Sequence, residues 1–336
     1  MNQVQKNYIA GQWVNGESTV KNINPSDHSE VVGEFAQASA EQVDQAIAAA
    51  RVAQVEWQAT GLETKQRVLQ AIGDEMIGRC DELGEVLSRE EGKPRVEGRG
   101  EVYRAGQFFQ YYAAEVLRQM GDTSDSVRPG VEIDVRREPM GVVTIISPWN
   151  FPTATASWKI APALAFGNAV IWKPANLTPA SAVLLAEIIA KQDIPAGLFN
   201  LVMGSGSSVG EKLITSDNID AITFTGSLAV GKRVAVAAAS NLTKFQLEMG
   251  SKNALVVLDD ADLDNAADCA VNGAFGGSGQ KCTASSRLIV TAGVHDEFVA
   301  KVKERMAKLK VGGALEEGVT IGPVSYTHLT LPTILL

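Results

Sequence analysis

The sequence predicts an α/β fold in which short parallel strands alternate with helices. Two observations indicate this class: the strand-type runs are almost wholly apolar, and helical stretches separate them. The apolar runs are residues 141–146, 169–172, 198–202 and 221–224. The helical stretches cover roughly residues 155–166, 179–192 and 207–216. Ligands of such sheets bind beyond the carboxyl ends of the strands, so the loops after these runs are the first candidates for function.

The composition is that of a soluble globular protein long enough for two domains. The chain has 336 residues, of which 45% are hydrophobic and 21% charged. A net charge of −9 without a long basic run argues against nucleic acid and anionic membranes as partners. Three distant cysteines and three histidines lack metal-ligand spacing, so we expect no metal. No signal-peptide core or membrane-spanning run is visible, which predicts a cytoplasmic protein.

The first 120 residues predict a strand pair followed by helices. The strand pair covers residues 8–16, and residues 22–35 are rich in turn signals. Helices begin near Ser39, Thr64 and Val96. Cys80 falls at the end of the second helix, where we expect a structural role.

The third helix carries an aromatic stripe that we assign to packing. The stripe comprises Tyr103, Phe108, Phe109, Tyr111 and Tyr112. Beyond it, residues 131–138 alternate apolar and charged side chains, which is typical of a strand with one solvated face. A lone exposed strand invites aggregation, so we expect it to form a subunit contact.

Two strand ends carry polar side chains that are able to act on a ligand. Asn150 lies in the loop Pro148-Trp149-Asn150-Phe151-Pro152, whose prolines hold it in one orientation, as an oxyanion donor requires. Lys173 follows the next strand and could reach ribose hydroxyls or phosphate. Each also has an ordinary alternative: a turn asparagine and a solvated lysine.

Two glycine-rich turns follow later strands. Residues 204–210 resemble the dinucleotide fingerprint with one extra residue before Gly210, and they include Gly206. Residues 224–231 place Gly226 and Ser227 at a helix N-terminus, where amides and a hydroxyl are able to hold a phosphate. Either turn could simply connect a strand to a helix, but two such turns on one sheet favour a nucleotide-binding crevice.

Two further side chains have the chemistry of a nucleophile and a base. Cys282 lies between a glycine-rich stretch and a strand, where an activated thiol attacks carbonyls; a buried small hydrophobe is the alternative. Glu248 stands in an otherwise apolar strand, where burial would raise its pKa towards that of a general base. A salt bridge, for example to Lys252, is the alternative.

Five segments together resemble the NAD(P)-dependent aldehyde dehydrogenase superfamily. They occur in the family's order, and Glu248 precedes Cys282 by 34 residues. The segments are Pro148-Trp149-Asn150-Phe151-Pro152, Lys173-Pro174, Phe224-Thr225-Gly226-Ser227, Leu247-Glu248-Met249-Gly250 and Gly279-Gln280-Lys281-Cys282. The resemblance implies a Rossmann-type sheet domain, an α/β catalytic domain and an oligomerisation hairpin.

The resemblance also implies roles for individual residues. Cys282 would attack the aldehyde to give a thiohemiacetal and then a thioester, Asn150 would hold the oxyanion, and Glu248 would activate water. Lys159 matches a family lysine near the site. NAD or NADP would be bound by Lys173 at the adenosine ribose and by Ser227 at the pyrophosphate. Gly206, Gly210, Gly226, Asn176 and Trp149 complete the expected cofactor site.

Within the family, the sequence looks most like the α-ketoglutaric semialdehyde (2,5-dioxopentanoate) dehydrogenases. Succinic semialdehyde dehydrogenases, the alternative, commonly have an arginine where Trp158 stands. Asn176 replaces a glutamate that in many NAD-selective members repels a 2′-phosphate, so NADP could be tolerated. Ser251 replaces a family glycine, which could displace Glu248 slightly.

The resemblance divides the chain as follows. The dinucleotide-binding domain covers residues 1–123 and 142–247, the oligomerisation hairpin 124–141, and the amino-terminal part of the catalytic domain 248–324. Residues 325–336 resemble nothing in the family and are interpreted as an artefact. We therefore expect a chain that lacks the rest of its catalytic domain and is either an enzyme or an inactive nucleotide-binding fragment. The full-length form is expected to be a dimer or tetramer.

Overall fold

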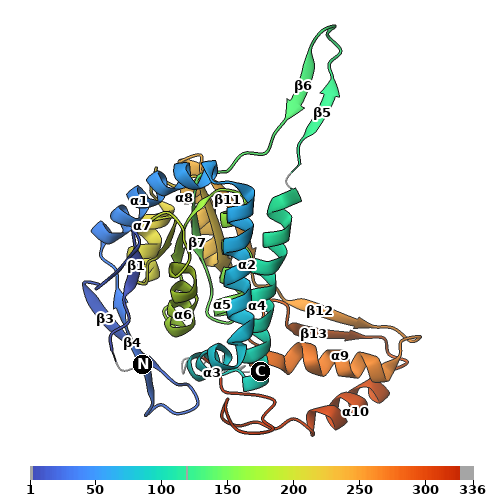
Figure 1. Ribbon diagram of the computed structural model, residues 1–336. Helices are drawn as coiled ribbons and strands as arrows, with labels where there is room; N and C mark the ends of the chain where they lie inside the picture. Colours follow the sequence, from blue (N-terminus) through green and yellow to red (C-terminus); the bar gives the residue numbers. More distant parts are fainter. Residues whose placement is uncertain (1–2, 119, 326–336) are drawn as a thin grey trace.

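A computed structural model describes residues 3–118 and 120–325 (Figure 1). The expected tail at residues 325–336 lies outside these ranges except for Ser325. The ribbon shows a large sheet-and-helix body, a smaller lobe beside it and a hairpin that projects away from both.

The body is built on one seven-stranded sheet with the order β11-β10-β7-β8-β9-β1-β2. From β11 to β9 the neighbours are parallel, whereas β1 runs antiparallel to both β9 and β2. The strands are β1 Asn7–Ile9, β2 Gln12–Val14, β7 Val142–Ile146, β8 Ala169–Lys173, β9 Phe199–Leu201, β10 Ala221–Gly226 and β11 Lys244–Met249. The predicted parallel α/β fold and the amino-terminal strand pair are thus confirmed.

Helices cover both faces of this sheet and bury its apolar strands. They are α1 Ala40–Ala59, α5 Pro152–Ala165, α6 Pro179–Ala190, α7 Glu211–Ile214 and α8 Leu228–Ser240. Helix α1 begins with a capping box: Ser39 accepts from the Gln42 amide, and the Gln42 side chain accepts from the Ser39 amide.

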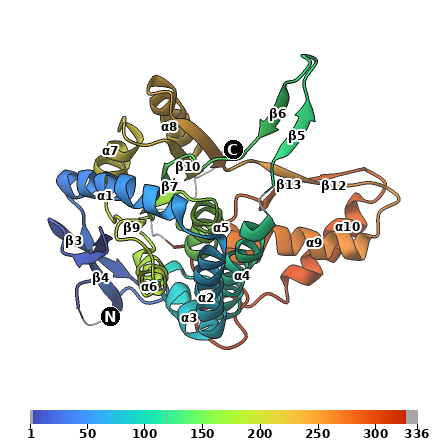
Figure 2. The ribbon, with the colours of Figure 1, turned by 45° about the horizontal axis from the view of Figure 1, so that its top comes forward.

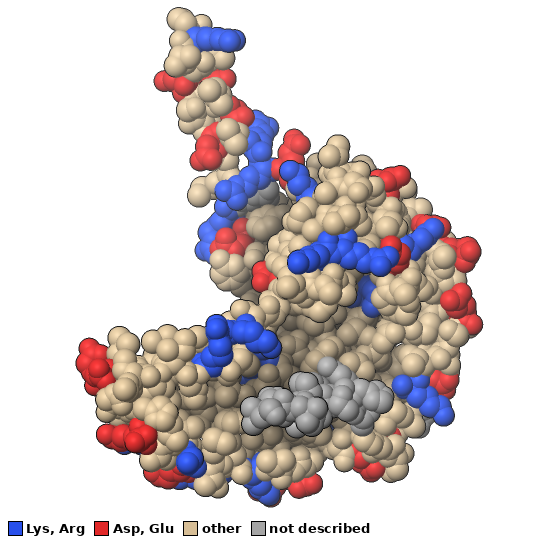
Figure 3. Space-filling view, turned by 180° about the vertical axis from the view of Figure 1, so that it is seen from behind, with Lys and Arg blue, Asp and Glu red and all other residues tan. Residues whose placement is uncertain are grey.

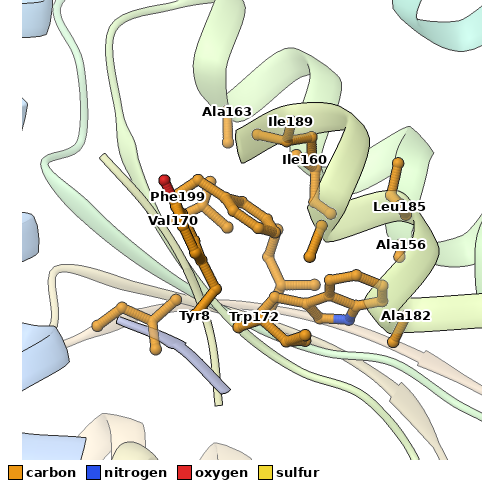
Figure 4. Close-up of a cluster of buried hydrophobic side chains, with 14 of the residues drawn as sticks. Tyr8, Ala156, Ile160, Ala163, Val170, Trp172, Ala182, Leu185, Ile189 and Phe199 are labelled. Carbon is orange, nitrogen blue, oxygen red and sulfur yellow. The ribbon is translucent and has the colours of Figure 1, made fainter. Parts of the chain in front are cut away.

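An aromatic cluster at β8 and β9 lies within the core of the body. Trp172 and Phe199 are fully buried, with ring centroids 6.3 Å apart, and Ile160 and Leu185 pack over them from α5 and α6 (Figure 4). The Trp172 Nε1 donates to Ser147 Oγ at 2.8 Å, which satisfies the only polar atom of the indole. This cluster fixes the strand ends that carry Asn150 and Lys173.

Three elements of the amino-terminal region differ from the sequence prediction: two strands and a helix. The turn-rich stretch 22–35 lies within an antiparallel hairpin of β3 (Ser18–Ile23) and β4 (Val31–Gln37), because its turn residues only connect two strands. Cys80 does not end a helix: it opens a further helix, α3 (Cys80–Glu91), and is buried. Its neighbours are α2 (Leu62–Gly78) and α4 (Arg95–Glu115), which continues as a short 3₁₀ turn, Val116–Arg118.

The strand predicted at residues 131–138 is not alone. The observed β6 (Glu132–Val135) pairs antiparallel with β5 (Asp122–Asp125) in a hairpin that projects from the body (Figures 1 and 2). The sequence Asp-Thr-Ser-Asp of β5 lacks apolar alternation, so the local pattern did not predict this strand, although the family resemblance implied a hairpin at residues 124–141. All residues of both strands are exposed.

The smaller lobe is a two-stranded parallel sheet covered on one face. Strands β12 (Asn253–Val257) and β13 (Ser285–Val290) pack on α9 (Leu263–Phe275) and α10 (His295–Met306). Buried Val257, Ala267, Ala270 and Phe298 form its core. On the opposite face, the paired Val256 and Ile289 are 59% and 51% exposed. None of the helices in the described residues is long and apolar enough to cross a bilayer.

Candidate active site

The loop after β7 is tied directly to the loop that carries Cys282. The Asn150 Nδ2 donates to the backbone oxygen of Gln280 at 2.7 Å, two residues before the cysteine. A side-chain amide has two N–H donors, so this bond leaves one for a ligand oxygen. Asn150 is half-buried, in agreement with a rigid and accessible donor.

A buried ion pair holds the Asn150 loop from behind. The Lys93 Nζ donates to the Asn150 backbone oxygen at 2.6 Å and to Glu101 Oε2 at 2.7 Å. Burial opposes the charge on Lys93, but the carboxylates of Glu101 and Glu91 outweigh it and raise the Lys93 pKa. Glu101 Oε1 accepts from the amides of Thr153 and Ala154 in the first turn of α5. Sequence reasoning missed this pair, because its members meet Asn150 only through long-range packing.

The thiol loop itself is held by contacts on both sides of Cys282. The Asn253 Nδ2 donates to the Cys282 backbone oxygen at 2.7 Å, and the Gly277 amide donates to Glu97 Oε1 at 3.0 Å. The turn at Gly276–Gly279 includes three residues with positive φ, of which Ser278 at 55° is the strained one. Cys282 is exposed, which excludes the alternative of a buried hydrophobe for the described chain.

A cavity of about 410 Å³ lies between α4, α5 and this loop. Positions 97, 101, 104 and 108 of α4 face it at the spacing of one helical stripe. Its lining residues are Lys93, Glu97, Gly100, Glu101, Arg104, Phe108, Asn150, Phe151, Ala154, Trp158, Gly277, Gln280 and Lys281. From behind, the molecular surface is hollowed between the body and the smaller lobe (Figure 3).

The aromatic stripe of α4 is therefore only partly a packing stripe. Phe109 is fully buried as predicted, but Phe108 lines the cavity and contacts Trp158 edge-on, with centroids 5.9 Å apart. Tyr103 and Tyr111 are 41% and 57% exposed. Assigning all of these residues to the core was wrong, because the stripe is wider than the face that α4 buries.

Lys159 and Glu248 lie at a second cavity, of about 380 Å³, that shares Trp158 with the first. The Lys159 Nζ donates to Thr223 Oγ1 at 2.6 Å and to Gln246 Oε1 at 3.0 Å. The Gln246 Nε2 in turn donates to Glu248 Oε1 at 2.7 Å. Burial lowers the pKa of Lys159 to about 8, and the Glu248 charge partly offsets this. Gln246 thus connects the two charged groups, a link the sequence did not reveal.

The expectation that Glu248 is buried was wrong. Glu248 is exposed, because β11 is an edge strand of the sheet and has β10 on one side only. Its alternative partner, Lys252, forms no ion pair with it among residues 3–118 and 120–325. The bond from Gln246 orients the carboxylate instead.

Lys173 lies at the carboxyl end of β8, and it is buried rather than solvated. It is 5% exposed, its Nζ donates to the Pro174 oxygen at 2.9 Å, and burial lowers its pKa to about 8. A Cβ added at Gly210 would lie 3.5 Å from Lys173 Cδ, so this glycine borders the lysine. Gly206–Gly210 forms a single π-helical turn, and a Cβ on Gly206 would meet open space.

The other predicted cofactor residues lie at neighbouring strand ends. Gly226 ends β10, and Ser227 caps α8 by accepting from the Val230 amide at 3.3 Å. Asn176 is exposed in the loop after β8, and Trp149 is half-buried beside Asn150. The predicted cofactor residues therefore lie at or after the carboxyl ends of β7, β8, β9 and β10. Cys282 itself lines neither of the two cavities.

A parallel sheet with glycine turns after its strands, and a fixed amide bonded to the loop that carries an exposed thiol, define an α/β protein of dinucleotide-binding architecture. The chain belongs to the aldehyde dehydrogenase family, whose model matches residues 13–328. The resemblance drawn from the five segments is confirmed.

Relatives and solved structures agree with this membership. The chain is 43% identical to alpha-ketoglutaric semialdehyde dehydrogenase of Bacillus subtilis, covering 95% of this chain and 66% of that protein. It is 38% identical to glutarate-semialdehyde dehydrogenase of Pseudomonas aeruginosa, covering 95% and 66%. The betaine aldehyde dehydrogenase of Staphylococcus aureus in complex with NAD+ superposes with a TM-score of 0.93 at 35% identity, covering 96% and 65%. The chain thus spans about two thirds of the length of the curated relatives it matches.

Proposed function

We propose that this protein oxidises an aldehyde to a carboxylic acid with NAD or NADP, through a covalent intermediate on Cys282. The observation that carries this proposal is the bond from Asn150 into the cysteine loop, because it fixes a side-chain amide of the cavity wall against Gln280, two residues before the thiol. Family membership supports the same chemistry.

In this mechanism the Cys282 thiolate attacks the aldehyde carbon, and the carbonyl oxygen becomes an oxyanion. The free N–H of Asn150 and the Cys282 amide hold that oxyanion. A bound nicotinamide would supply the hydride acceptor that turns the thiohemiacetal into a thioester. Glu248 then takes a proton from water, which attacks the thioester and releases the acid together with the thiol. Lys159 positions Glu248 through Gln246.

The residues at the sheet edge fit a dinucleotide. The buried Lys173 ammonium has three N–H donors but bonds only Pro174 within the described ranges, so two remain for ribose hydroxyls. Space is open at Gly206, and Ser227 with the first turn of α8 offers donors for pyrophosphate. Gly210, Gly226 and Trp149 complete this set. Asn176 carries no charge to repel a 2′-phosphate, so NADP remains admissible.

The proposed substrate is α-ketoglutaric semialdehyde, and succinic semialdehyde is the alternative. The B. subtilis relative at 43% identity carries the first activity in its name. Trp158 occupies the position where succinic semialdehyde dehydrogenases commonly have an arginine that binds the substrate carboxylate. We further propose a cytoplasmic protein whose β5–β6 hairpin pairs with another copy, since its strands are exposed on every residue.

A second candidate is a nucleotide-binding chain without turnover. It is favoured by two exposed features. Glu248 is exposed, whereas we expect a general base to be shielded from solvent, and the apolar outer face of β12 and β13 is exposed, whereas we expect such a face to be covered. The two candidates share the cofactor residues and differ in chemistry at Cys282.

The test is NAD(P)H formation by the purified chain with α-ketoglutaric semialdehyde, followed by absorbance with NAD and NADP separately. Turnover that Cys282→Ala abolishes and Cys269→Ala retains supports the proposal, since Cys269 is also exposed but lies on α9. Turnover that survives Cys282→Ala would refute it. Cofactor binding without any turnover or burst would favour the second candidate.

Glu248→Gln separates the two chemical steps. We expect a full-size NAD(P)H burst followed by turnover slowed at least about a hundredfold, because general base catalysis contributes roughly 10²–10⁴-fold. Stopped-flow absorbance measures both phases. Loss of the burst itself would assign Glu248 to hydride transfer or to cysteine activation instead.

A further inference from the structure

Among the side chains that line the cavity beside Asn150, the cations outnumber the carboxylates by one. Lys93, Arg104 and Lys281 line it together with only two carboxylates, Glu97 and Glu101. An apolar and aromatic wall of Phe108, Phe151 and Trp158 makes up much of the rest. A cavity with this balance favours a ligand that has an apolar body and one negative charge.

Two of the three cations already have a carboxylate beside them. Lys93 bonds Glu101 at 2.7 Å in a buried pair. Glu97 lies near Lys281, since a Cβ added at Gly276 would be 2.8 Å from the Lys281 Nζ and 3.6 Å from Glu97 Oε1, although the two form no ion pair within the described residues. Glu91, which does not line the cavity, lies 3.9 Å from the Lys93 Nζ and further offsets that cation.

Arg104 is the cation of this cavity whose side-chain hydrogen bond goes to a neutral group. Within the described residues it forms no ion pair, and its hydrogen bond is a neutral one, from Nη1 to Gln107 Oε1 on its own helix at 3.1 Å. It stands on the α4 stripe one turn from Phe108 and from Glu101, so it shares the cavity with Asn150 while lying on a different wall. A guanidinium is a planar fork of N–H donors that matches a carboxylate.

We infer that Arg104 binds the distal carboxylate of an ω-oxo acid whose aldehyde end lies at Asn150 and Cys282. This inference rests on the proposed function and deepens it, because it names the substrate class and the residue that selects it. Arg104 supplies, from α4, the guanidinium that is missing at position 158 of α5. The aliphatic chain of the substrate lies against Phe108 and Trp158.

The test uses thiohemiacetal formation, which needs neither cofactor nor turnover. The alkylation rate of Cys282 by iodoacetamide is followed by peptide mass spectrometry, with exposed Cys269 as the internal reference. Two competing aldehydes of equal chain length, 5-oxopentanoate and pentanal, are titrated as protectants. The variants are Arg104→Met, Arg104→Lys and, as a matched control on the same helix, Arg99→Met, whose guanidinium pairs with Asp81 outside the cavity.

For the unchanged chain, we expect half-protection at a concentration at least about tenfold lower for 5-oxopentanoate than for pentanal, as one charge-assisted bond implies. Arg104→Met should abolish this preference and leave protection by pentanal unchanged, Arg104→Lys should restore part of it, and Arg99→Met should keep it. A preference that survives Arg104→Met overturns the inference. Equal protection of the unchanged chain by both aldehydes also overturns it while leaving the proposed function intact. Protection by neither aldehyde would overturn both.

Discussion

At the residue scale, Lys173 shows how a binding group costs stability. Its ammonium is almost fully buried with one backbone acceptor, and burial lowers its pKa from 10.5 to about 8. The folded chain therefore binds fewer protons than the unfolded chain between these values, so the penalty is complete below pH 8 and vanishes as pH rises to 10.5.

Lys173→Met is accordingly expected to stabilise the folded chain at pH 7, by up to about 3 kcal/mol, because each pKa unit corresponds to about 1.4 kcal/mol. The advantage over the unchanged chain should shrink between pH 8 and 10.5. Urea denaturation of both proteins at pH 7 and 10 measures it. A variant less stable at pH 7 would show that the hydrogen bond to Pro174 outweighs the cost of burial.

At the scale of elements, the helical hairpin of α3 and α4 organises the start of two sheet helices. Both α5 and α6 begin with proline and lack a side-chain cap of their own. Buried glutamates supply the acceptors instead: Glu101 bonds the first amides of α5, and Glu90 bonds the amides of Ala180 and Ser181 in α6. Burial raises the pKa of Glu90 to about 8, although those hydrogen bonds partly offset it.

The Lys93–Glu101 pair gives a prediction at this scale. Lys93→Met leaves Glu101 buried without its cation, so we expect the free energy of unfolding to fall by about 3–5 kcal/mol. Lys93→Met combined with Glu101→Gln should lose less than the sum of the single changes, and Arg99→Met, which breaks only a surface pair, should not measurably alter stability. Denaturant titrations of the unchanged chain, Lys93→Met, Glu101→Gln and the double variant form the cycle, and Arg99→Met is the control outside it. Strict additivity would show that the pair is not coupled.

Features that depend on the local sequence pattern were predicted, whereas features that depend on long-range packing were not. The parallel sheet, its connecting helices and the residues at its carboxyl edge followed from apolar periodicity and from five short segments. The Lys93–Glu101 pair, the Gln246 link and the position of Arg104 depend on how α4 packs against α5 and the cysteine loop, which no local pattern contains. Glu248 was misjudged because its exposure depends on β11 being at the sheet edge.

At the scale of the whole molecule, paired strands expose apolar side chains on the β5–β6 hairpin and on the outer face of the small sheet. Val131, Ile133 and Val135 are each about half exposed on the hairpin, as are the cross-strand partners Val256 and Ile289 on the small sheet. Surfaces of this kind promote association.

Val256→Thr combined with Ile289→Thr is therefore expected to weaken concentration-dependent self-association while changing the free energy of unfolding by no more than about 0.5 kcal/mol. Threonine keeps the β-branched shape, so strand geometry is preserved. Sedimentation velocity over a concentration series measures the effect, with Val52→Thr on exposed α1 as the control. Unchanged association would exclude this face as its cause.

The cavity-facing side chains of α4 fall into two groups, one that holds the backbone and one that faces the substrate, and this division has a consequence for evolution. Of its four cavity-facing side chains, Glu97 and Glu101 are committed to backbone amides of the thiol loop and of α5. Arg104 and Phe108 have no such commitment, and they share a regular helix whose backbone does not depend on them. Arg104 and Phe108 would then determine the substrate preference, and each could be substituted separately without moving the reacting groups. After a gene duplication, we expect the two copies to diverge first in the substrate that they bind and last in the reaction that they catalyse.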